Sequence, residues 1–202
     1  RRVSDAEFIG LFGAVGEQGS ITNVGVVDSY FNAYAVTGGI CGYLVGGTIR
    51  NCYNSAIVKG TPVSSGDTDF TIGGVCGGLY QGTISNCYNN GAVSGTKNVG
   101  AVCGAIEESS PFTFANCYYD NEKCSVEGIN NSDALGRTFG KSTAQFSSGE
   151  VAYLLSKGYN GSVWGQKLGT DSYPILGGAK VYYGYALNDC QHISYSNTTR
   201  TE

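Results

Sequence analysis

Two short blocks recur along the first part of the chain, and their repetition constrains the fold more strongly than any other feature. The first block reads Gly-Gly-apolar-Cys-Gly, and the second, which follows it, reads Gly-Thr-Ile-x-Asn-Cys-Tyr-Asn. Copies of the first lie at residues 38–42, 73–77 and 99–104, copies of the second at 47–54, 82–89 and, shortened, 113–118, and weaker versions of both at 9–13 and 19–24. Self-similarity of this kind is typical of repeat proteins.

The spacing of the repeats predicts a parallel β-solenoid of about four coils. Anchored on Gly13, Gly42, Gly77 and Gly104, the repeats are 29, 35 and 27 residues apart. The variable length lies between repeats, as in 61–70, where a loop absorbs insertions that stacked strands do not tolerate. No repeat is large enough to fold alone, whereas stacked copies share a continuous apolar core. Short strands and Gly corners fit coils stacked ~4.8 Å apart.

Each repeat also predicts a corner. Ile49 and Cys52 are separated by an odd number of positions, so both cannot face inward from one straight strand. A corner at Asn51 resolves the conflict, because Asn tolerates the left-handed backbone and its side chain forms hydrogen bonds along a ladder. We therefore expect the equivalent asparagines to stack at one corner, namely Asn23, Asn51, Asn86 and Asn116.

Composition excludes several classes of protein. The chain has 202 residues and a formal charge of −4, and only 14% of its residues are charged, against a usual ~25%. A disordered chain would carry more charge and fewer aromatic residues. No apolar run approaches the ~18 residues of a membrane span, and the mild acidic charge argues against nucleic acid as a partner. Because the chain opens with Arg1-Arg2-Val3, without Met or a signal peptide, we expect a fragment of a larger protein.

The repeats resemble the GLUG-motif repeats of bacterial cell-surface and secreted proteins, which also occur in some surface-anchored immunoglobulin A peptidases. The resemblance covers roughly Phe8 to Tyr119. The first copy departs from the motif at Phe12 and Val24, where later copies have Cys, and the fourth departs through 107–112. The resemblance implies a β-solenoid, an extracellular or cell-surface location and a role in presenting or contacting something. It implies no catalysis, because the peptidase chemistry lies in separate domains.

Beyond the repeats, residues 134–181 predict a small cap, and 182–202 a tail or a linker to a further domain, which leaves 1–133 for the solenoid. Ser147 and Glu150 have capping-box spacing ahead of one short helix, and Gly158 is placed to end it. The segment resembles the one that often ends runs of GLUG repeats. A cap of this kind would cover unpaired strand edges and the apolar core. Within it, Trp164 is expected to anchor the cap core rather than to bind a ligand.

The eight cysteines are the sharpest chemical feature of the sequence. Their spacing does not match zinc sites, so a metal is the weakest interpretation. Ladders of reduced core thiols are favoured, and inter-coil disulfides remain an alternative because in-register Cα atoms ~4.8 Å apart lie within the disulfide range. Outside the repeat phase, Cys124 and Cys190 form a separate candidate pair. We expect two interior ladders, Cys41/Cys76/Cys103 and Cys52/Cys87/Cys117.

A tyrosine follows each cysteine of the second ladder, at Tyr53, Tyr88 and Tyr118. If the cysteines point inward, alternation turns these rings outward. The common role of such a column is ring stacking that stiffens the sheet. The alternative is an exposed stripe that contacts a glycan or a partner protein.

An enzyme finds little support in the sequence. The carboxylates lie outside the repeat strands, and the single histidine, His192, lies in the tail. No hydrolase, nucleotide or zinc motif is present, and EF-hand spacing is missing around Asp120. We therefore predict no catalytic residue, no cofactor and no metal. The carboxylates considered are Asp67, Asp69, Glu107, Glu108, Asp120, Glu122 and Glu127.

The resulting hypothesis is a non-catalytic adhesion or binding module of a larger bacterial surface protein, with a host or matrix glycan or protein as its partner. A spacer that presents another domain is the first alternative, and a β-helix carbohydrate-active enzyme is the weakest. A Tyr-lined or acidic groove continuous over three coils would favour binding, and a featureless polar exterior would favour the spacer. Two carboxylates ~5–10 Å apart in a cleft would favour the enzyme.

Overall fold

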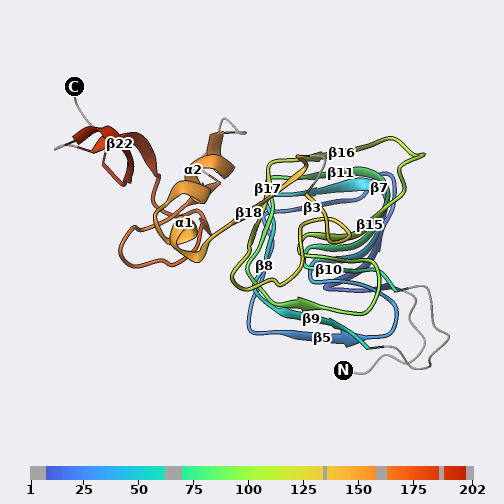
Figure 1. The fold of residues 1–202 in the computed structure, drawn as a ribbon. Helices are drawn as coiled ribbons and strands as arrows, with labels where there is room; N and C mark the ends of the chain where they lie inside the picture. Colours follow the sequence, from blue (N-terminus) through green and yellow to red (C-terminus); the bar gives the residue numbers. More distant parts are fainter. Residues whose placement is uncertain (1–7, 62–69, 134–135, 158–162, 187–188, 199–202) are drawn as a thin grey trace. The chain divides into compact units, whose positions relative to one another are not determined.

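The computed structural model describes residues 8–61, 70–133, 136–157, 163–186 and 189–198. These residues belong to two compact units, 1–140 and 141–202. The first unit is the parallel β-solenoid predicted from the repeats, and its four coils are residues 8–33, 36–60, 72–94 and 99–120 (Figure 1).

Each full coil contributes to four parallel sheets, here called A to D in chain order. Sheet A contains β1 (Phe8–Ile9), β6 (Val36–Gly38), β10 (Ile72–Gly73) and β14 (Val99–Gly100). Sheet B contains β2 (Phe12–Val15), β3 (Ser20–Thr22), β7 (Cys41–Arg50), β11 (Cys76–Ser85), β15 (Cys103–Ile106) and β16 (Phe112–Ala115). Sheet C contains β4 (Gly25–Val26), β8 (Tyr53–Asn54), β12 (Tyr88–Asn89), β17 (Cys117–Asp120) and β18 (Thr138–Lys141), and sheet D contains β5 (Tyr30–Ala33), β9 (Ile57–Gly60) and β13 (Val93–Ser94).

The coils stack with equivalent repeat positions in register. Ile49 pairs with Ile21 on one side and with Ile84 on the other, and all three side chains are buried. Phe114 takes this position in the fourth coil. The apolar core is therefore a set of columns parallel to the solenoid axis, as expected when each coil covers the next.

The predicted corner is confirmed. Asn23, Asn51, Asn86 and Asn116 all have a left-handed backbone, with φ between 52° and 58°. The Asn51 amide donates to the Asn23 side chain at 3.1 Å, and the Asn116 amide donates to Asn86 at 2.7 Å. Because the corner turns the chain after Ile49, Ile49 and Cys52 are both fully buried.

A second asparagine column, not predicted from the sequence, lies inside the coils. Asn54 donates to Asn89 at 2.7 Å, and each side chain also closes a local turn, to Ala56 and to Gly91. Glycine at 39 makes this column possible, because a Cβ there would lie 2.3 Å from Oδ1 of Asn54. The second glycine of the Gly-Gly block therefore leaves room for a buried asparagine.

The end of the stack beyond coil 4 is covered by the loop that follows β17. Backbone amides of Ala101, Val102 and Cys103 donate to carbonyls of Glu127 and Gly128, and Asn130 donates back to Cys103. This loop satisfies the strand edge that coil 4 would otherwise expose. That residues 134–181 also close the stack stays a prediction.

The second unit contains α1 (Thr143–Ser147), α2 (Glu150–Lys157), the β19 (Trp164–Gly165) and β20 (Ile175–Leu176) pair, and the antiparallel hairpin of β21 (Tyr182–Ala186) and β22 (Asp189–Ser196). Two short helices therefore replace the single helix expected. Trp164 is buried, as predicted for a core anchor. These two strands lie within 182–202, the segment expected as a tail or linker, and Tyr183 of β21 stacks on Tyr153 of α2 at 5.3 Å.

The capping box lies one helix earlier than predicted. Ser142 caps α1 by accepting from the Gln145 amide, while the Gln145 side chain accepts from the Ser142 amide. The backbone amide of Glu150, at the start of α2, instead donates to the Ser148 hydroxyl at 3.3 Å. The Ser147–Glu150 box is therefore wrong, because Ser147 already belongs to α1. Gly158 lies outside the described residues.

Candidate functional site

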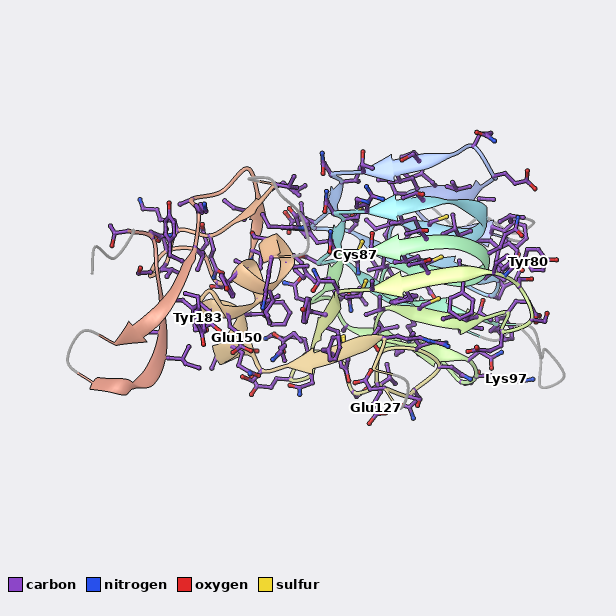
Figure 2. The ribbon with its side chains drawn as sticks, turned by 90° about the horizontal axis from the view of Figure 1, so that it is seen from above. Tyr80, Cys87, Lys97, Glu127, Glu150 and Tyr183 are labelled. Carbon is purple, nitrogen blue, oxygen red and sulfur yellow. The ribbon has the colours of Figure 1, made fainter. Side chains whose placement is uncertain are left out.

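The two cysteine ladders lie inside the coils, as predicted. Cys76 pairs in register with Cys41 and Cys103, and the six ladder cysteines are fully buried free thiols. Each thiol donates to the carbonyl two residues away, for example Cys87 to Ser85 at 3.2 Å. Figure 2 shows Cys87 among the interior side chains of the stacked coils. The ladders are thus core structure rather than accessible chemistry.

Interactions within the ladders and burial raise the pKa of three of these thiols. The neighbouring Cys87 thiol, together with burial, raises the pKa of Cys52, and burial and Cys117 raise that of Cys87. The pKa of Cys76 is raised by hydrogen bonds to its two neighbours in the ladder, while that of Cys41 is lowered by its bond to Cys76. A raised pKa is expected for Cys52, Cys76 and Cys87, because a thiolate inside an apolar core lacks solvation.

Cys124 ends the inner asparagine column. Its thiol is free, accepts from Asn89 at 3.1 Å and donates to the Gly91 carbonyl at 3.0 Å. Burial, followed by the charge of Asp120, raises its pKa to about 12. The side chain of Cys190, the other member of the candidate pair, lies outside the described residues.

The tyrosine column is stacked, but it is not an exposed stripe. Tyr53 and Tyr88 lie 5.2 Å apart with nearly parallel rings, and Tyr118 is in register with Tyr88. Tyr88 is 1% exposed and Tyr118 is 5% exposed, so the expectation that the rings face solvent is wrong for these two. Tyr53 is half-buried. The physical reason is that the rings of coils 2 to 4 lie in register, while Phe139 covers Tyr118 from 5.8 Å. In coil 1 the equivalent residue is Gly25, and the Tyr53 ring lies against it. The stacking interpretation fits this geometry.

A different aromatic surface lies where sheets A and B meet. A groove of ≈ 400 Å³ crosses all four coils there, and Phe8, Tyr43, Gly78 and Glu107 contribute to its lining. Phe8 and Tyr43 stack at 4.9 Å with an interplanar angle of 10°. Both side chains are half-buried, so this stack is partly open to solvent.

Side-chain size along the repeat produces the groove. Tyr43 is in register with Ala14 in coil 1, with Gly78 in coil 3 and, through Gly78, with Ala105 in coil 4. A Cβ at Gly78 would lie 2.7 Å from Cδ2 and Cε2 of Tyr43, so the Tyr43 ring lies against the glycine backbone. The ring column therefore ends after two rings and leaves a hollow over coils 3 and 4.

Polar groups border this hollow. The Thr71 hydroxyl is buried and has no hydrogen-bond partner among the described residues. Glu107 accepts from the Ser109 hydroxyl and amide, and these bonds lower the pKa of its carboxyl. Burial, followed by the charge of Glu107, raises the pKa of Tyr43. The groove thus combines an aromatic face with a carboxylate that stays ionised at neutral pH.

Tyr80 directly follows Leu79, which lines the groove, and its outward position has a cause that the sequence did not reveal. The β7–β11 register shifts between Leu79 and Gln81, so Tyr80 is an extra residue at an irregularity of the ladder. Such positions redirect side chains outward, and Tyr80 is 41% exposed; Figure 2 shows it at the surface of the solenoid. Neither Tyr43 nor Tyr80 recurs in the repeat. That departure from the repeat was the one signal available in the sequence.

A second pocket, of ≈ 250 Å³, contains two carboxylates whose hydrogen-bonding positions are already used. Glu108 binds Arg137 through both carboxylate oxygens, at 2.7 and 3.3 Å, and this interaction lowers its pKa. Asp133 accepts from the Tyr119 hydroxyl at 2.7 Å, from Thr138 and from the Gly128 amide. This pocket is therefore an internally bonded corner of the solenoid.

The other residues considered as candidate chemical groups lie outside the groove or outside the described residues. Asp120 is buried and accepts from the Glu122 amide at 2.9 Å, and Glu127 accepts from the Asp133 amide. Asp67, Asp69 and the His192 side chain lie outside the described part of the chain. Within that part, no group of three or more His, Cys, Asp or Glu side chains is arranged to hold a metal ion. No described helix combines the length and apolar character needed to cross a membrane.

Comparison with known proteins supports the repeat interpretation. Two segments, residues 33–59 and 69–94, match the GLUG motif. Among solved structures, a candidate immunoglobulin A1 protease from Bacteroides ovatus matches with a TM-score of 0.55 and 22% sequence identity. That match covers 81% of this chain and 61% of the other chain, and at this identity it shows the fold alone. A search of curated proteins finds no match. The chain therefore carries GLUG-motif repeats, folded as a parallel β-solenoid.

Proposed function

We propose that this region is a non-catalytic adhesion or binding module of a larger bacterial surface protein, and that the groove between sheets A and B is its contact surface. The observation that carries the proposal is the continuity of the groove across four coils, with the Phe8–Tyr43 stack in its wall. Concave sites with an aromatic wall and a few polar groups are the usual form of ligand sites.

The groove favours a binding module over a plain spacer. A spacer needs only stacked coils, as in the Tyr53–Tyr88–Tyr118 column, where rings of three successive coils lie in register and Tyr88 and Tyr118 are buried. At residue 43 the same backbone register combines one large ring with two small residues, Gly78 and Ala105. The groove that results is open to solvent, which a contact surface requires and a spacer does not.

A non-catalytic role fits the carboxylates. Glycoside hydrolysis requires a pair of carboxyl groups flanking the bond that breaks. Glu107 is the one carboxylate among the lining residues of the groove. In the smaller pocket, Glu108 is held by Arg137, and Asp133 already accepts three hydrogen bonds. Neither pocket presents an acid and base pair ready to act on a substrate.

The location and the attached domains follow from the family resemblance. GLUG repeats and the likeness to a candidate immunoglobulin A1 protease support a secreted or surface-exposed protein. This chain spans 61% of that relative, so further domains of the same polypeptide are part of the proposal. The partner is a host or matrix glycan or protein, reached without insertion into a membrane.

The test is a binding screen of the whole 202-residue chain on a glycan array and on immobilised matrix proteins. We expect retention of at least one ligand by the parent, and its loss in a Tyr43→Ala/Tyr80→Ala double variant. Tyr30→Ala is the matched control, because Tyr30 is 56% exposed on β5 of sheet D. If the parent retains no ligand, or if the double variant binds like the parent, the groove is not a contact surface and the spacer is favoured.

A further inference from the structure

We propose that the coil 1 end of the solenoid is a docking face for a further β-solenoid coil, which precedes coil 1 in the same polypeptide and stacks on it in parallel register. Coil 1, residues 8–33, is then an inner coil of a longer solenoid. Stacking of a coil on this face is independent of whether the groove between sheets A and B binds a ligand.

Coil 1 presents an open strand edge in all four sheets. Its strands β1, β2, β4 and β5 are each the last strand of their sheet, and β3 pairs only with β7. Figure 2 shows the coil 1 strands, in pale blue, at one end of the stack. Within the described residues, each of these strands is therefore paired on one side only. An open edge of this kind is a template for another strand.

The opposite end of the stack is closed in a way that coil 1 is not. There, the loop after β17 forms backbone hydrogen bonds with coil 4 through Glu127, Gly128 and Asn130. Natural sheets protect a free edge with Lys, Pro or a bulge, and a terminal repeat usually has a polar outer face. Coil 1 contains no Lys, Arg or Pro, and its only charged residues are Glu17 and Asp28. Its composition is that of an inner coil rather than an end coil.

The interior of the core is also open at coil 1. Phe12 continues the ladder of Cys41, Cys76 and Cys103, because it pairs in register with Cys41. The ladder cysteines are fully buried, whereas Phe12 is 42% exposed and its neighbour Leu11 is 51% exposed. A coil stacked on coil 1 would cover Phe12 as coil 1 covers Cys41. Burial of these large apolar side chains would stabilise the longer stack.

One glycine identifies a coil, rather than another kind of partner, as the occupant. Gly42, Gly77 and Gly104 share one position in coils 2 to 4, and a Cβ on each would lie 2.6 Å from the carbonyl oxygen of the equivalent glycine in the preceding coil. Gly13 has this position in coil 1, yet among the described residues a Cβ there would meet only the Phe8 carbonyl, at 3.2 Å. The backbone of Gly13 is not left-handed, so its conformation does not require glycine. A stacked coil would require it.

The asparagine corner gives the occupant its direction. In this ladder the side-chain amide of the later coil donates to the earlier coil, from Asn51 to Asn23 and from Asn116 to Asn86. Asn23 accepts from Asn51, and within the described part of the chain its own side-chain amide has no acceptor. The corner asparagine of a preceding coil would supply that acceptor in the same orientation.

A second copy of the chain fits this face less well than a preceding coil. Head-to-tail stacking would use the coil 4 end of the second copy, which the loop after β17 covers. A two-fold axis at the coil 1 end would reverse the sense in which the second coil winds, so Gly13 and Asn23 would not meet their equivalents. A parallel coil of the same polypeptide satisfies both positions.

Gly13→Ala tests whether a coil is stacked on coil 1, and Gly42→Ala is the matched control. In the 202-residue chain we expect Gly42→Ala to lower the melting temperature by about 4 °C or more, because its methyl group collides with the coil 1 backbone. Gly13→Ala should change it by less than about 2 °C, because a less flexible unfolded chain offsets the close contact with Phe8. In the full-length polypeptide, with unfolding followed by hydrogen exchange in coil 2, both variants should be equally destabilising.

An added coil tests the same face without the rest of the polypeptide. Residues 36–60 followed by 34–35 are placed directly before Phe8, so that a copy of coil 2 precedes coil 1 in register, and the chain without residues 1–7 is the reference. We expect the melting temperature to rise by about 4 °C or more and the coil 1 amides to exchange more slowly. Ile49→Asp in the added copy should abolish the rise. Gly13→Ala should now be as destabilising as Gly42→Ala.

Several results would overturn the inference. Equal losses from Gly13→Ala and Gly42→Ala in the 202-residue chain would show that this chain already covers coil 1. An added coil that does not stabilise the chain would show that the face does not accept one. A harmless Gly13→Ala in the full-length polypeptide would show that no coil occupies the face there. Dimers of that polypeptide in sedimentation velocity, dissociated by Leu11→Glu, would identify a second copy as the occupant instead.

Discussion

Two aromatic stacks on one solenoid differ in how many successive coils contribute a ring at the same position. In sheet C, Tyr53, Tyr88 and Tyr118 occupy one position in three successive coils, so each ring covers the next and the column is largely buried. Between sheets A and B, the Phe8–Tyr43 stack stops at Gly78, and a hollow remains. The residues that repeat regularly therefore form the packed column, and the candidate site forms where side-chain size departs from the repeat.

The comparison also separates stability from function. A ring that neighbours enclose contributes to folding through its buried area, whereas a half-exposed ring contributes less and stays available to a partner. We therefore expect substitutions in the Tyr53–Tyr88–Tyr118 column to change stability, and substitutions in the groove to change binding. The predictions below are ordered from the largest expected effect to the smallest.

The largest effect is expected inside the coils that support both stacks. Ile84 is fully buried and pairs in register with Ile49 and Phe114. Ile84→Asp would place an unpaired carboxylate in the core, so we expect a loss of more than about 4 kcal/mol and unfolding of the solenoid. Circular dichroism during thermal melting measures this effect. Tyr80→Asp, at an exposed position on the same strand, is the control and should melt within a few degrees of the parent.

The second prediction compares the two stacks directly. Tyr88→Ala removes a buried ring, and we expect it to lower the free energy of unfolding by about 3–4 kcal/mol. Tyr43→Ala removes a half-buried ring, with an expected loss of about 1 kcal/mol. Urea denaturation of the two variants, followed in parallel, measures both changes. Equal losses would break the comparison, because they would show that the groove stack is as much a part of the core as the tyrosine column.

The third prediction uses the thiols beneath the stacks. The pKa values of Cys52, Cys76 and Cys87 are raised in the folded chain. Above the ordinary cysteine pKa of about 8.5, the unfolded chain loses these protons while the folded chain keeps them, so stability falls as pH rises. We expect the melting temperature to be constant from pH 7 to 8 and to fall between pH 8.5 and 10. Over that range the free energy of unfolding decreases by up to about 1.4 kcal/mol per pH unit for each thiol.

Matched cysteine variants sharpen this prediction. Cys52→Ala/Cys87→Ala should flatten the fall in melting temperature between pH 8.5 and 10. Cys41→Ala should leave the fall at least as steep, because the pKa of Cys41 is lowered and its contribution has the opposite sign. The readout is the slope with pH, since every alanine variant also leaves a small cavity. A parent chain whose melting temperature holds through pH 10 would show that the ladder thiols ionise in the folded state.

Much of the solenoid was predictable from local pattern. The recurrence of Gly-Gly-apolar-Cys-Gly and of Asn-Cys-Tyr predicted the coils, their register and the two thiol ladders. The odd separation of Ile49 and Cys52 predicted the corner at Asn51. These features follow from chain geometry repeated at each coil, so one copy suffices to predict the others. In the second unit the helix start was misplaced, because Ser142–Gln145 and Ser147–Glu150 have the same capping spacing and only tertiary packing selects between them.

The sequence by itself determined the coil, its corners and the columns of identical side chains, because these depend on residues close together in the chain and on a regular repeat. Only the tertiary structure decided which aromatic rings are covered. Tyr88 is buried by residues 35 positions before it and 30 after it, and the groove joins Phe8, Tyr43 and Gly78 from three different coils. Whether a ring is exposed depends on the residues that stacking places beside it. A large neighbour in the next coil covers the ring and makes it part of the core, whereas a small neighbour leaves it available as contact surface.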